Sequence, residues 1–349
     1  MVYLFQFRRY RLPFRTPVRT AHGPWGERVG LLVRLTDATG RVGYGEAAPI
    51  PWFGTETVDE VEAACRELGE KVDEARLAAV PGRLGCLRNA LTAAQADIAG
   101  GGAISSAAGS QERRVKDNAP YLPVAALLPA GRAALALIGA KAEAGFRVFK
   151  WKVGVEDVAD ELVLLDDVCA TLPNGAKLRL DANGAWDRRQ AERWLERCAD
   201  RPVEFVEQPI AAGARGAADV LLGLAGDFPT PLALDESLTG GEDIERWLGA
   251  GWPGVFVVKP ALLGDAEAAL ARLAKAKAAV VFSSALETAV GAKAALQAAF
   301  VWPGEARALG FGVWPLFADA RFDGPYLAPF IHWEDVARLN PEAVWNALS

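Results

Sequence analysis

From about residue 121 onward, short apolar runs of strand length alternate with segments of helix length. Apolar runs of roughly four to eight residues favour buried strands, and the segments between them carry apolar residues at helical spacing. Regular alternation of this kind is typical of a parallel sheet and predicts an α/β fold, a (β/α) barrel. The eight predicted strands are Tyr121–Ala125, Val148–Val153, Lys177–Leu180, Val203–Val206, Pro231–Leu234, Gly254–Val258, Val280–Phe282 and Ala308–Phe311.

The first hundred or so residues follow a different pattern and predict a small α+β unit. Two apolar runs, Arg28–Leu35 and Arg41–Gly45, flank the turn residues Asp37–Gly40 and predict a hairpin. Apolar residues at helical spacing then predict helices over Val58–Leu77 and Leu87–Ile98.

A run of small residues, 100–110, follows this unit and predicts a connector or exposed loop. The change in pattern predicts three parts of the chain. They are an N-terminal α+β domain over 1–115, a (β/α) barrel over 116–318, and a C-terminal tail over 319–349 that packs back on the N-terminal domain. The tail is predicted because it begins in an apolar, proline-rich stretch that is too irregular for another strand-helix unit.

Polar side chains stand at the ends of six of the predicted strands, 24 to 29 residues apart, about one strand-plus-helix unit each. In a barrel of this kind the C-terminal strand ends open on one face, where active sites lie. We therefore expect six side chains to converge on one mouth: Lys152, Asp181, Glu207, Asp235, Lys259 and Ser283.

Three carboxylates brought this close would repel one another unless a cation neutralised them. Asp181, Glu207 and Asp235 offer only oxygen ligands and leave positions for water and substrate, which suits Mg²⁺ better than Ca²⁺. Zinc is disfavoured because neither Cys nor His accompanies the carboxylates. We predict a Mg²⁺ cofactor, for which Mn²⁺ is expected to substitute.

The two strand-end lysines predict proton transfer next to a carboxylate. Lys152 and Lys259 follow the second and sixth predicted strands, so they are expected to face each other across the mouth. Mg²⁺ would acidify the C–H beside a substrate carboxylate, and a lysine made less basic by nearby cations could remove the proton. Lys150 is either an electrostatic support for this chemistry or a packed neighbour that points away from Lys152.

Composition and charge narrow the class of function. The net charge of −6 comes from interspersed charges without a clustered basic run, which excludes a nucleic-acid partner. No uncharged stretch is long enough to span a membrane, and the N-terminus lacks the order of a signal peptide. Four widely spaced cysteines favour free thiols in the cytoplasm. With only His22 and His332 present, the chemistry must rest on Asp, Glu and Lys. The sequence predicts no oligomeric state.

Five ordered motifs resemble those of the enolase superfamily, in its muconate-lactonizing subgroup. They are Lys150-Trp-Lys152, Leu180-Asp181-Ala-Asn183, Val206-Glu207-Gln-Pro209, Leu234-Asp235-Glu236-Ser237 and Val258-Lys259-Pro260, and Gly43–Pro49 resembles the capping-domain hairpin. The resemblance implies an enolase-type, modified TIM barrel with an N-terminal α+β capping domain. It also implies that Lys152 is the base and then the acid, that Lys259 is the facing cation, and that the three carboxylates bind Mg²⁺.

Within the subgroup, Arg179–Trp186 and Ser283–Glu287 resemble the o-succinylbenzoate synthase family of menaquinone and phylloquinone biosynthesis. That resemblance implies a lyase, a hydro-lyase that dehydrates a cyclohexadiene carboxylate through an enediolate. Ser283 and Gly310 match positions that hold the polar ends of the substrate. Arg19 lies where a mobile capping loop, residues 15–23, is expected to close the mouth, and it either meets a substrate carboxylate or is a solvated loop residue.

Two alternatives stay open. The first is an N-acylamino acid racemase or dipeptide epimerase of the same subgroup, which uses the same two lysines. The stretch Leu309–Val313 lacks the Asp-x-Asp pair with which the epimerases hold a substrate ammonium, and this disfavours the epimerase. The second is a catalytically inactive barrel that serves as a binding protein. It is disfavoured because all five metal and lysine positions are intact.

Overall fold

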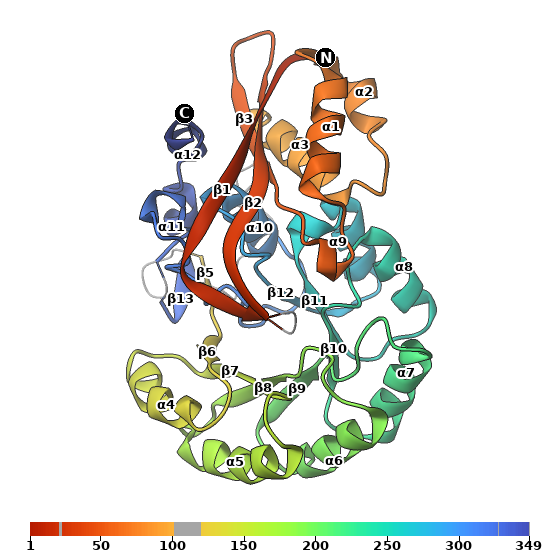
Figure 1. Ribbon diagram of the computed structural model, residues 1–349, viewed down its shortest axis with the longest axis vertical. Coiled ribbons are helices and arrows are strands. Elements are labelled where there is room, and N and C mark those ends of the chain that lie inside the picture. The colour runs from red at the N-terminus through yellow and green to blue at the C-terminus, as the bar shows by residue number, and fades with distance from the viewer. Residues whose placement is uncertain (21–22, 101–119, 327, 349) are drawn as a thin grey trace.

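The computed structural model describes residues 1–20, 23–100, 120–326 and 328–348 (Figure 1). Its N-terminal part holds an antiparallel sheet with strand order β3-β2-β1-β4. The predicted hairpin is confirmed: Asp37 Oδ1 accepts hydrogen bonds from the amides of Thr39 and Arg41, which closes the turn between β2 and β3. The strands are β1 Val2–Thr20, β2 Gly23–Thr36, β3 Val42–Ala47 and β4 Lys71–Asp73.

The segment 15–23, predicted as a loop, is largely strand instead. Strand β1 continues to Thr20 and pairs with β2 as far as Thr20 with Gly23, with one irregularity between Pro13 and Val18. Strand β2 supplies partners for the backbone of this segment, a non-local pairing that its own composition does not announce. His22 lies outside the described residues, as does the predicted connector beyond Gly100.

The helix predicted over Val58–Leu77 is broken. Helix α1, Val58–Leu68, begins at a capping box between Thr57 and Glu60 and ends at Gly69, and β4 and the short helix α2, Glu74–Ala78, follow. Glycine favours such an end because it tolerates a positive φ, here 72°. Helix α3, Gly85–Ile98, lies so close to β3 that a side chain at Gly43 or Gly45 would clash with its backbone.

The rest of the chain forms a curled, parallel seven-stranded sheet with helices around its outside (Figure 1). This is the (β/α) barrel that the alternation predicts, of the enolase type that the resemblance implies. The strands are β6 Ala126–Leu128, β7 Val148–Lys152, β8 Lys177–Asp181, β9 Val203–Glu207, β10 Leu232–Leu234, β11 Val255–Val258 and β12 Ala279–Phe282. The helices are α4 Ala133–Glu143, α5 Val158–Thr171, α6 Arg188–Cys198, α7 Ala217–Asp227, α8 Gly241–Gly249, α9 Ala266–Lys275 and α10 Ala289–Phe300.

Two of the eight predicted strands are placed differently. Residues 121–123 form β5, which pairs antiparallel with β13, Phe330–His332, while the first barrel strand is β6. The segment Ala308–Phe311 makes single bridges, Leu309 with Val124 and Gly310 with Ser283. These bridges connect the two ends of the seven-stranded sheet, so the eighth position closes the barrel without a full strand.

Strand alternation separates two packed layers in the barrel. A small apolar cluster contains Phe205, Ala233, Val257 and Val281, each two residues before a strand-end polar residue. Residues i and i+2 of a strand share a face, so the strand-end side chains stand on the face of this cluster. The large core, which includes Trp151 and Trp194, lies between the strands and the surrounding helices.

The C-terminal residues contact the N-terminal sheet. Helices α11, Trp333–Ala337, and α12, Pro341–Ala347, follow β13. Arg8 Nη1 donates a 2.6 Å hydrogen bond to the carbonyl of Trp345, and the Trp345 ring lies 6.0 Å from that of Tyr44. These contacts support the proposed packing of the tail on the capping domain. The boundaries at residues 115 and 318 stay predictions, and residue 115 lies outside the described residues. Within the described residues no helix is both long and apolar enough to cross a membrane.

Candidate active site

Strand register brings the predicted site residues to one end of the barrel. Lys152 is the direct partner of Asp181 across β7 and β8, and Asp181 is the partner of Glu207 across β8 and β9. Asp235 and Lys259 follow the last residues of β10 and β11, which are neighbouring strands. The side chains therefore meet where parallel strands end, as in other barrel enzymes.

Lys150 lies within the site. Its Nζ is 2.9 Å from Oδ2 of Asp181 and 2.7 Å from Oε1 of Glu207. The alternative that Lys150 points away from Lys152 is wrong, because residues two apart on a strand face the same side. Burial lowers the pKa of Lys150, but the charges of Asp181 and Glu207 outweigh that effect and raise the pKa above its ordinary value.

Lys259 forms a buried ion pair with Asp235. Its ammonium also lies 4.6 Å from the ring centre of Phe53, which the capping domain contributes through the 3₁₀ helix η1, Pro51–Phe53. Burial lowers the pKa of Lys259 to about 7, because removal from water disfavours the ammonium. Lys259 can therefore carry a positive charge near neutral pH and still lose a proton readily.

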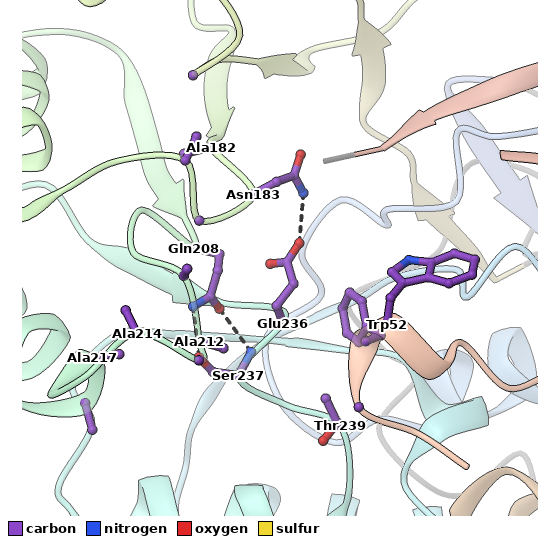
Figure 2. Close-up of a pocket in the computed structure, with 18 of the residues that line it drawn as sticks. Trp52, Ala182, Asn183, Gln208, Ala212, Ala214, Ala217, Glu236, Ser237 and Thr239 are labelled. Carbon is purple, nitrogen blue, oxygen red and sulfur yellow. Dashed lines mark hydrogen bonds between the residues drawn. The ribbon is translucent and has the colours of Figure 1, made fainter. Parts of the chain in front are cut away.

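Lys152 takes part in a chain of polar side chains. Its Nζ donates a 2.6 Å hydrogen bond to Oδ1 of Asn183, and the Asn183 amide donates a 3.0 Å hydrogen bond to Oε1 of Glu236. Figure 2 shows Asn183, after β8, and Glu236, after β10, pointing toward each other. Asn183 lies in the loop after β8, which ends in Asp181, and Glu236 directly follows Asp235 after β10. The two hydrogen bonds therefore position Lys152 relative to Asp181 and Asp235.

Two buried carboxyl groups at the site, Glu207 and Glu236, have raised pKa values. Burial raises the pKa of Glu207, and repulsion from Asp181 adds to the rise. Burial and the same repulsion raise the pKa of Glu236 to about 7, and among the described residues its buried Oε2 has no hydrogen-bond partner. Buried carboxylates of this kind are normally paired or bound to a metal.

In the part of the chain that the structure describes, no three Asp, Glu, His or Cys side chains are grouped as a formed metal site. Lys150 lies between two of the predicted ligands and Lys259 neutralises the third, Asp235. The donor set itself is all oxygen, and its three carboxylates share two lysine partners. Such a set suits a hard divalent cation such as Mg²⁺.

A cavity of about 190 Å³ lies over these groups and is walled by both parts of the chain. Lys152, Asp235 and Lys259 line it from the barrel, while Arg19 and Trp52 line it from the capping domain. A larger cavity of about 1160 Å³ adjoins it over the loops that follow β8, β9 and β10. The residues that line both are Thr20, Trp52, Phe53, Lys152, Asn183 and Glu236.

Comparisons with known proteins agree on one family. Residues 133–328 match the family model "Enolase C-terminal domain-like", and residues 3–84 match "MenC, N-terminal domain". The chain is 40% identical to the o-succinylbenzoate synthase of Thermosynechococcus vestitus, over 88% of this chain and 92% of that protein. The chain belongs to the o-succinylbenzoate synthase family of the enolase superfamily. It is also 31% identical to the Edwardsiella ictaluri o-succinylbenzoate synthase, over 85% and 86% of the two chains.

Solved structures extend this family likeness to the fold. The o-succinylbenzoate synthase from Thermosynechococcus elongatus, complexed with Mg in its active site, superposes with a TM-score of 0.76 and 37% identity, covering 88% of this chain and 92% of that one. The L-Ala-D/L-Glu epimerase from Bacillus subtilis gives a TM-score of 0.78 at 20% identity, with 94% and 95% covered. The second likeness shows the fold alone.

The structure places Ser283 and Gly310, which are expected to hold the polar ends of the substrate, at the closure of the barrel. Ser283 Oγ is 3.3 Å from the carbonyl oxygen of Gly310, and the two residues bridge across the closure of the barrel. A side chain at Gly310 would crowd Ser283, so glycine is required for this closure. Ser284 lines the smaller cavity, whereas Ser283 and Gly310 are not among its lining residues. Their roles, like that of Arg19, remain predictions.

Several residues at the site carried no predicted role. Asn183 and Glu236 stand within the strand-end motifs, and their places two residues after Asp181 and one residue after Asp235 could have singled them out. Trp52 and Phe53 come from the capping domain, where no local pattern shows that they face the mouth of a barrel formed by residues far along the chain.

Proposed function

We propose that this protein is an o-succinylbenzoate synthase, a hydro-lyase of menaquinone or phylloquinone biosynthesis. It would dehydrate 2-succinyl-6-hydroxy-2,4-cyclohexadiene-1-carboxylate to o-succinylbenzoate. The observation that carries the proposal is the pair Lys152 and Lys259 on one cavity, in a chain 40% identical to a synthase over most of its length. Two lysines beside a carboxylate cluster suit removal of a proton next to a substrate carboxylate.

In this mechanism Lys152 is the general base and then the general acid. It removes the proton from the ring carbon that bears the carboxylate, and it returns that proton to the hydroxyl that leaves from the neighbouring carbon. The ring loses water and becomes aromatic, which drives the elimination. Asn183 fixes the position of Lys152 through the 2.6 Å hydrogen bond.

Lys259 acts as a cation that stabilises the enediolate formed when the proton leaves. The Phe53 ring, 4.6 Å from its Nζ, favours the charged form by a cation–π interaction. Lys259 and its ion-pair partner Asp235 are both buried, so water is excluded around the ammonium. The electrostatic effect of Lys259 on the substrate is therefore stronger than it would be in solution.

Asp181, Glu207 and Asp235 would hold Mg²⁺, as supported by the Mg in the active site of the T. elongatus synthase. When bound, the cation would acidify the substrate C–H and offset the charge of the dianion. The same carboxylates pair with Lys150 and Lys259, so binding of the cation competes with these ion pairs. Mn²⁺ has similar ligand preferences and should substitute.

The direct test is to mix the purified protein with the cyclohexadiene substrate and Mg²⁺ and to follow the loss of substrate absorbance. Proton exchange at the α-carbon of a succinylated amino acid is measured in parallel. A protein that racemises succinylamino acids efficiently and leaves the cyclohexadiene untouched would be an N-acylamino acid racemase instead. The four free thiols, three of them buried, support a cytoplasmic location.

A further inference from the structure

Gln208 stands directly after Glu207 at the end of β9 and is completely buried. Its φ of 38° lies in the left-handed region, which is unfavourable for a residue with a side chain. Such a conformation persists only where the surrounding structure holds it. The hydrogen bonds of Gln208 show which neighbouring residues surround it in this conformation.

The side-chain amide of Gln208 uses its full hydrogen-bonding capacity. Figure 2 shows its side chain beside Ser237, one of its partners. Its Oε1 accepts from the backbone amides of Asp235 at 2.9 Å and Ser237 at 3.1 Å. Its Nε2 donates to Oγ of Ser237 at 2.8 Å and to the carbonyl of Ile210 at 2.9 Å. A primary amide has two donors and two acceptor positions, and all four are used here.

The backbone of Gln208 reaches the neighbouring strand ends as well. Its N–H donates to the carbonyl of Ala233 on β10 at 2.8 Å, and its carbonyl accepts from the amide of Gly184, after β8, at 2.6 Å. One residue therefore ties together the ends of three adjacent strands, the strands that carry Asp181, Glu207 and Asp235.

We propose that Gln208 is a positioning residue for the divalent cation: it fixes the backbone of Asp235 relative to Glu207 without touching the metal. The inference rests on the proposed function, since it requires Asp235 to be a metal ligand. Hydrogen bonds behind metal ligands typically change metal affinity by about 10- to 100-fold when they are removed. A side chain that only stabilised the loops would change the melting temperature and leave metal affinity unchanged.

The test measures Mn²⁺ affinity on chelator-treated full-length protein, with electron paramagnetic resonance reporting free Mn²⁺. Gln208→Met keeps the length of the side chain and removes all four hydrogen bonds. Gln208→Asn keeps the amide but shortens its reach by one methylene. Gln190→Met is the control, because Gln190 makes its hydrogen bonds in the capping box of α6 with Asp187, away from the site.

We expect the Mn²⁺ dissociation constant to rise about 10-fold or more in both Gln208 variants. It should stay at the wild-type value in Gln190→Met, whatever that change does to the melting temperature. Ser237→Ala removes one of the four hydrogen bonds and should give a smaller rise. If Gln208→Met does not fold, Gln208→Asn and Ser237→Ala decide the question.

Folded Gln208 variants with wild-type Mn²⁺ affinity would overturn the inference and leave the proposed function intact. A wild-type protein that binds no Mn²⁺ while it is folded would instead count against the proposed metal site itself. The two failures are therefore distinguishable in one experiment.

Discussion

The amide oxygen of Asn183 accepts a 2.6 Å hydrogen bond from Nζ of Lys152. A general base must be held within hydrogen-bond reach of the proton it removes, and an error of about 1 Å in position can cost about 100-fold in rate. We predict that Asn183→Leu, which preserves size but not the amide, lowers kcat by about 100-fold. Steady-state kinetics with the cyclohexadiene substrate measure this.

The control for this change is Asn340→Leu, which removes a hydrogen bond at the start of α12. It should lower stability without a comparable loss of kcat. Equal kcat losses in the two variants would mean that the contact with Lys152 has no particular role in catalysis.

Substitutions of Lys152 and Lys259 distinguish a dehydratase from a racemase. Lys152→Arg should lose about 1000-fold or more of either activity, because arginine has a pKa above about 12 and cannot serve as the base. Lys259→Arg keeps the positive charge that dehydration needs but cannot exchange a proton on the opposite face of a racemase substrate. We therefore expect measurable dehydration and no racemisation in Lys259→Arg.

The measurement pairs the dehydration assay with deuterium exchange at the α-carbon of a succinylated amino acid. Racemisation that survives in Lys259→Arg would show that Lys259 is not the second acid or base. Dehydration that survives in Lys152→Arg would exclude Lys152 as the base.

Removal of the metal is predicted to abolish activity. EDTA should reduce dehydration to background, and Mg²⁺ or Mn²⁺ should restore it, since the carboxylate cluster offers only oxygen ligands. Asp235→Asn should bind Mn²⁺ at least about tenfold more weakly. The control is Asp59→Asn, whose carboxylate pairs with Arg9 on the surface. Full activity in metal-free protein would refute the metal assignment.

The raised pKa of Glu287 makes the free energy of unfolding depend on pH. Burial raises the pKa of this carboxyl from 4.5 to about 7, and nearby Glu46 adds to the rise. Its Oε2 accepts a 2.9 Å hydrogen bond from Ser284, and its buried Oε1 has no partner in the part of the chain that the structure describes, as fits a protonated acid. Between pH 4.5 and 7 the folded state binds the proton more tightly than the unfolded state, so Glu287 destabilises the fold as pH rises.

The expected loss from this group is about 3 kcal/mol, complete above pH 7, since one pKa unit corresponds to about 1.4 kcal/mol. Glu287→Gln removes the titration, and its free energy of unfolding should exceed that of the wild type at pH 8 but not at pH 4.5. Urea unfolding at several pH values measures the difference. A difference that does not change with pH would contradict the prediction.

Glu46 joins the capping domain to the barrel. Its buried carboxylate accepts hydrogen bonds from Tyr10 and from the backbone amides of Thr288 and Gly291 at the start of α10. We predict that Glu46→Ala lowers the free energy of unfolding by about 3 kcal/mol, because several buried donors lose their acceptor.

Glu27→Ala is the control for Glu46→Ala, because Glu27 pairs with Arg11 at the exposed surface. Its effect should stay within about 0.5 kcal/mol. Urea unfolding measures both changes, and a loss for Glu46→Ala as small as that for Glu27→Ala would show that this interface contributes little stability.

The amino-acid sequence by itself determined the barrel and the positions at which its strands end in polar side chains. Apolar runs at regular intervals specify strands and helices locally, and the parallel arrangement then places Lys152, Asp181, Glu207, Asp235 and Lys259 at one end. The family followed from the same short motifs, because residues adjacent in sequence to each strand end carry its chemistry.

Only the tertiary structure decided which strands close the barrel and what the capping domain contributes. The predicted first strand pairs instead with β13, and Gly310 bridges to Ser283, because strand pairing depends on segments far apart in the chain. Arg19 lies on a strand, and Trp52 and Phe53 reach the cavity, because the fold brings the capping domain over the barrel mouth. The hydrogen bonds of Lys152 and Gln208 depend on loops from three strands, so no local pattern could specify them.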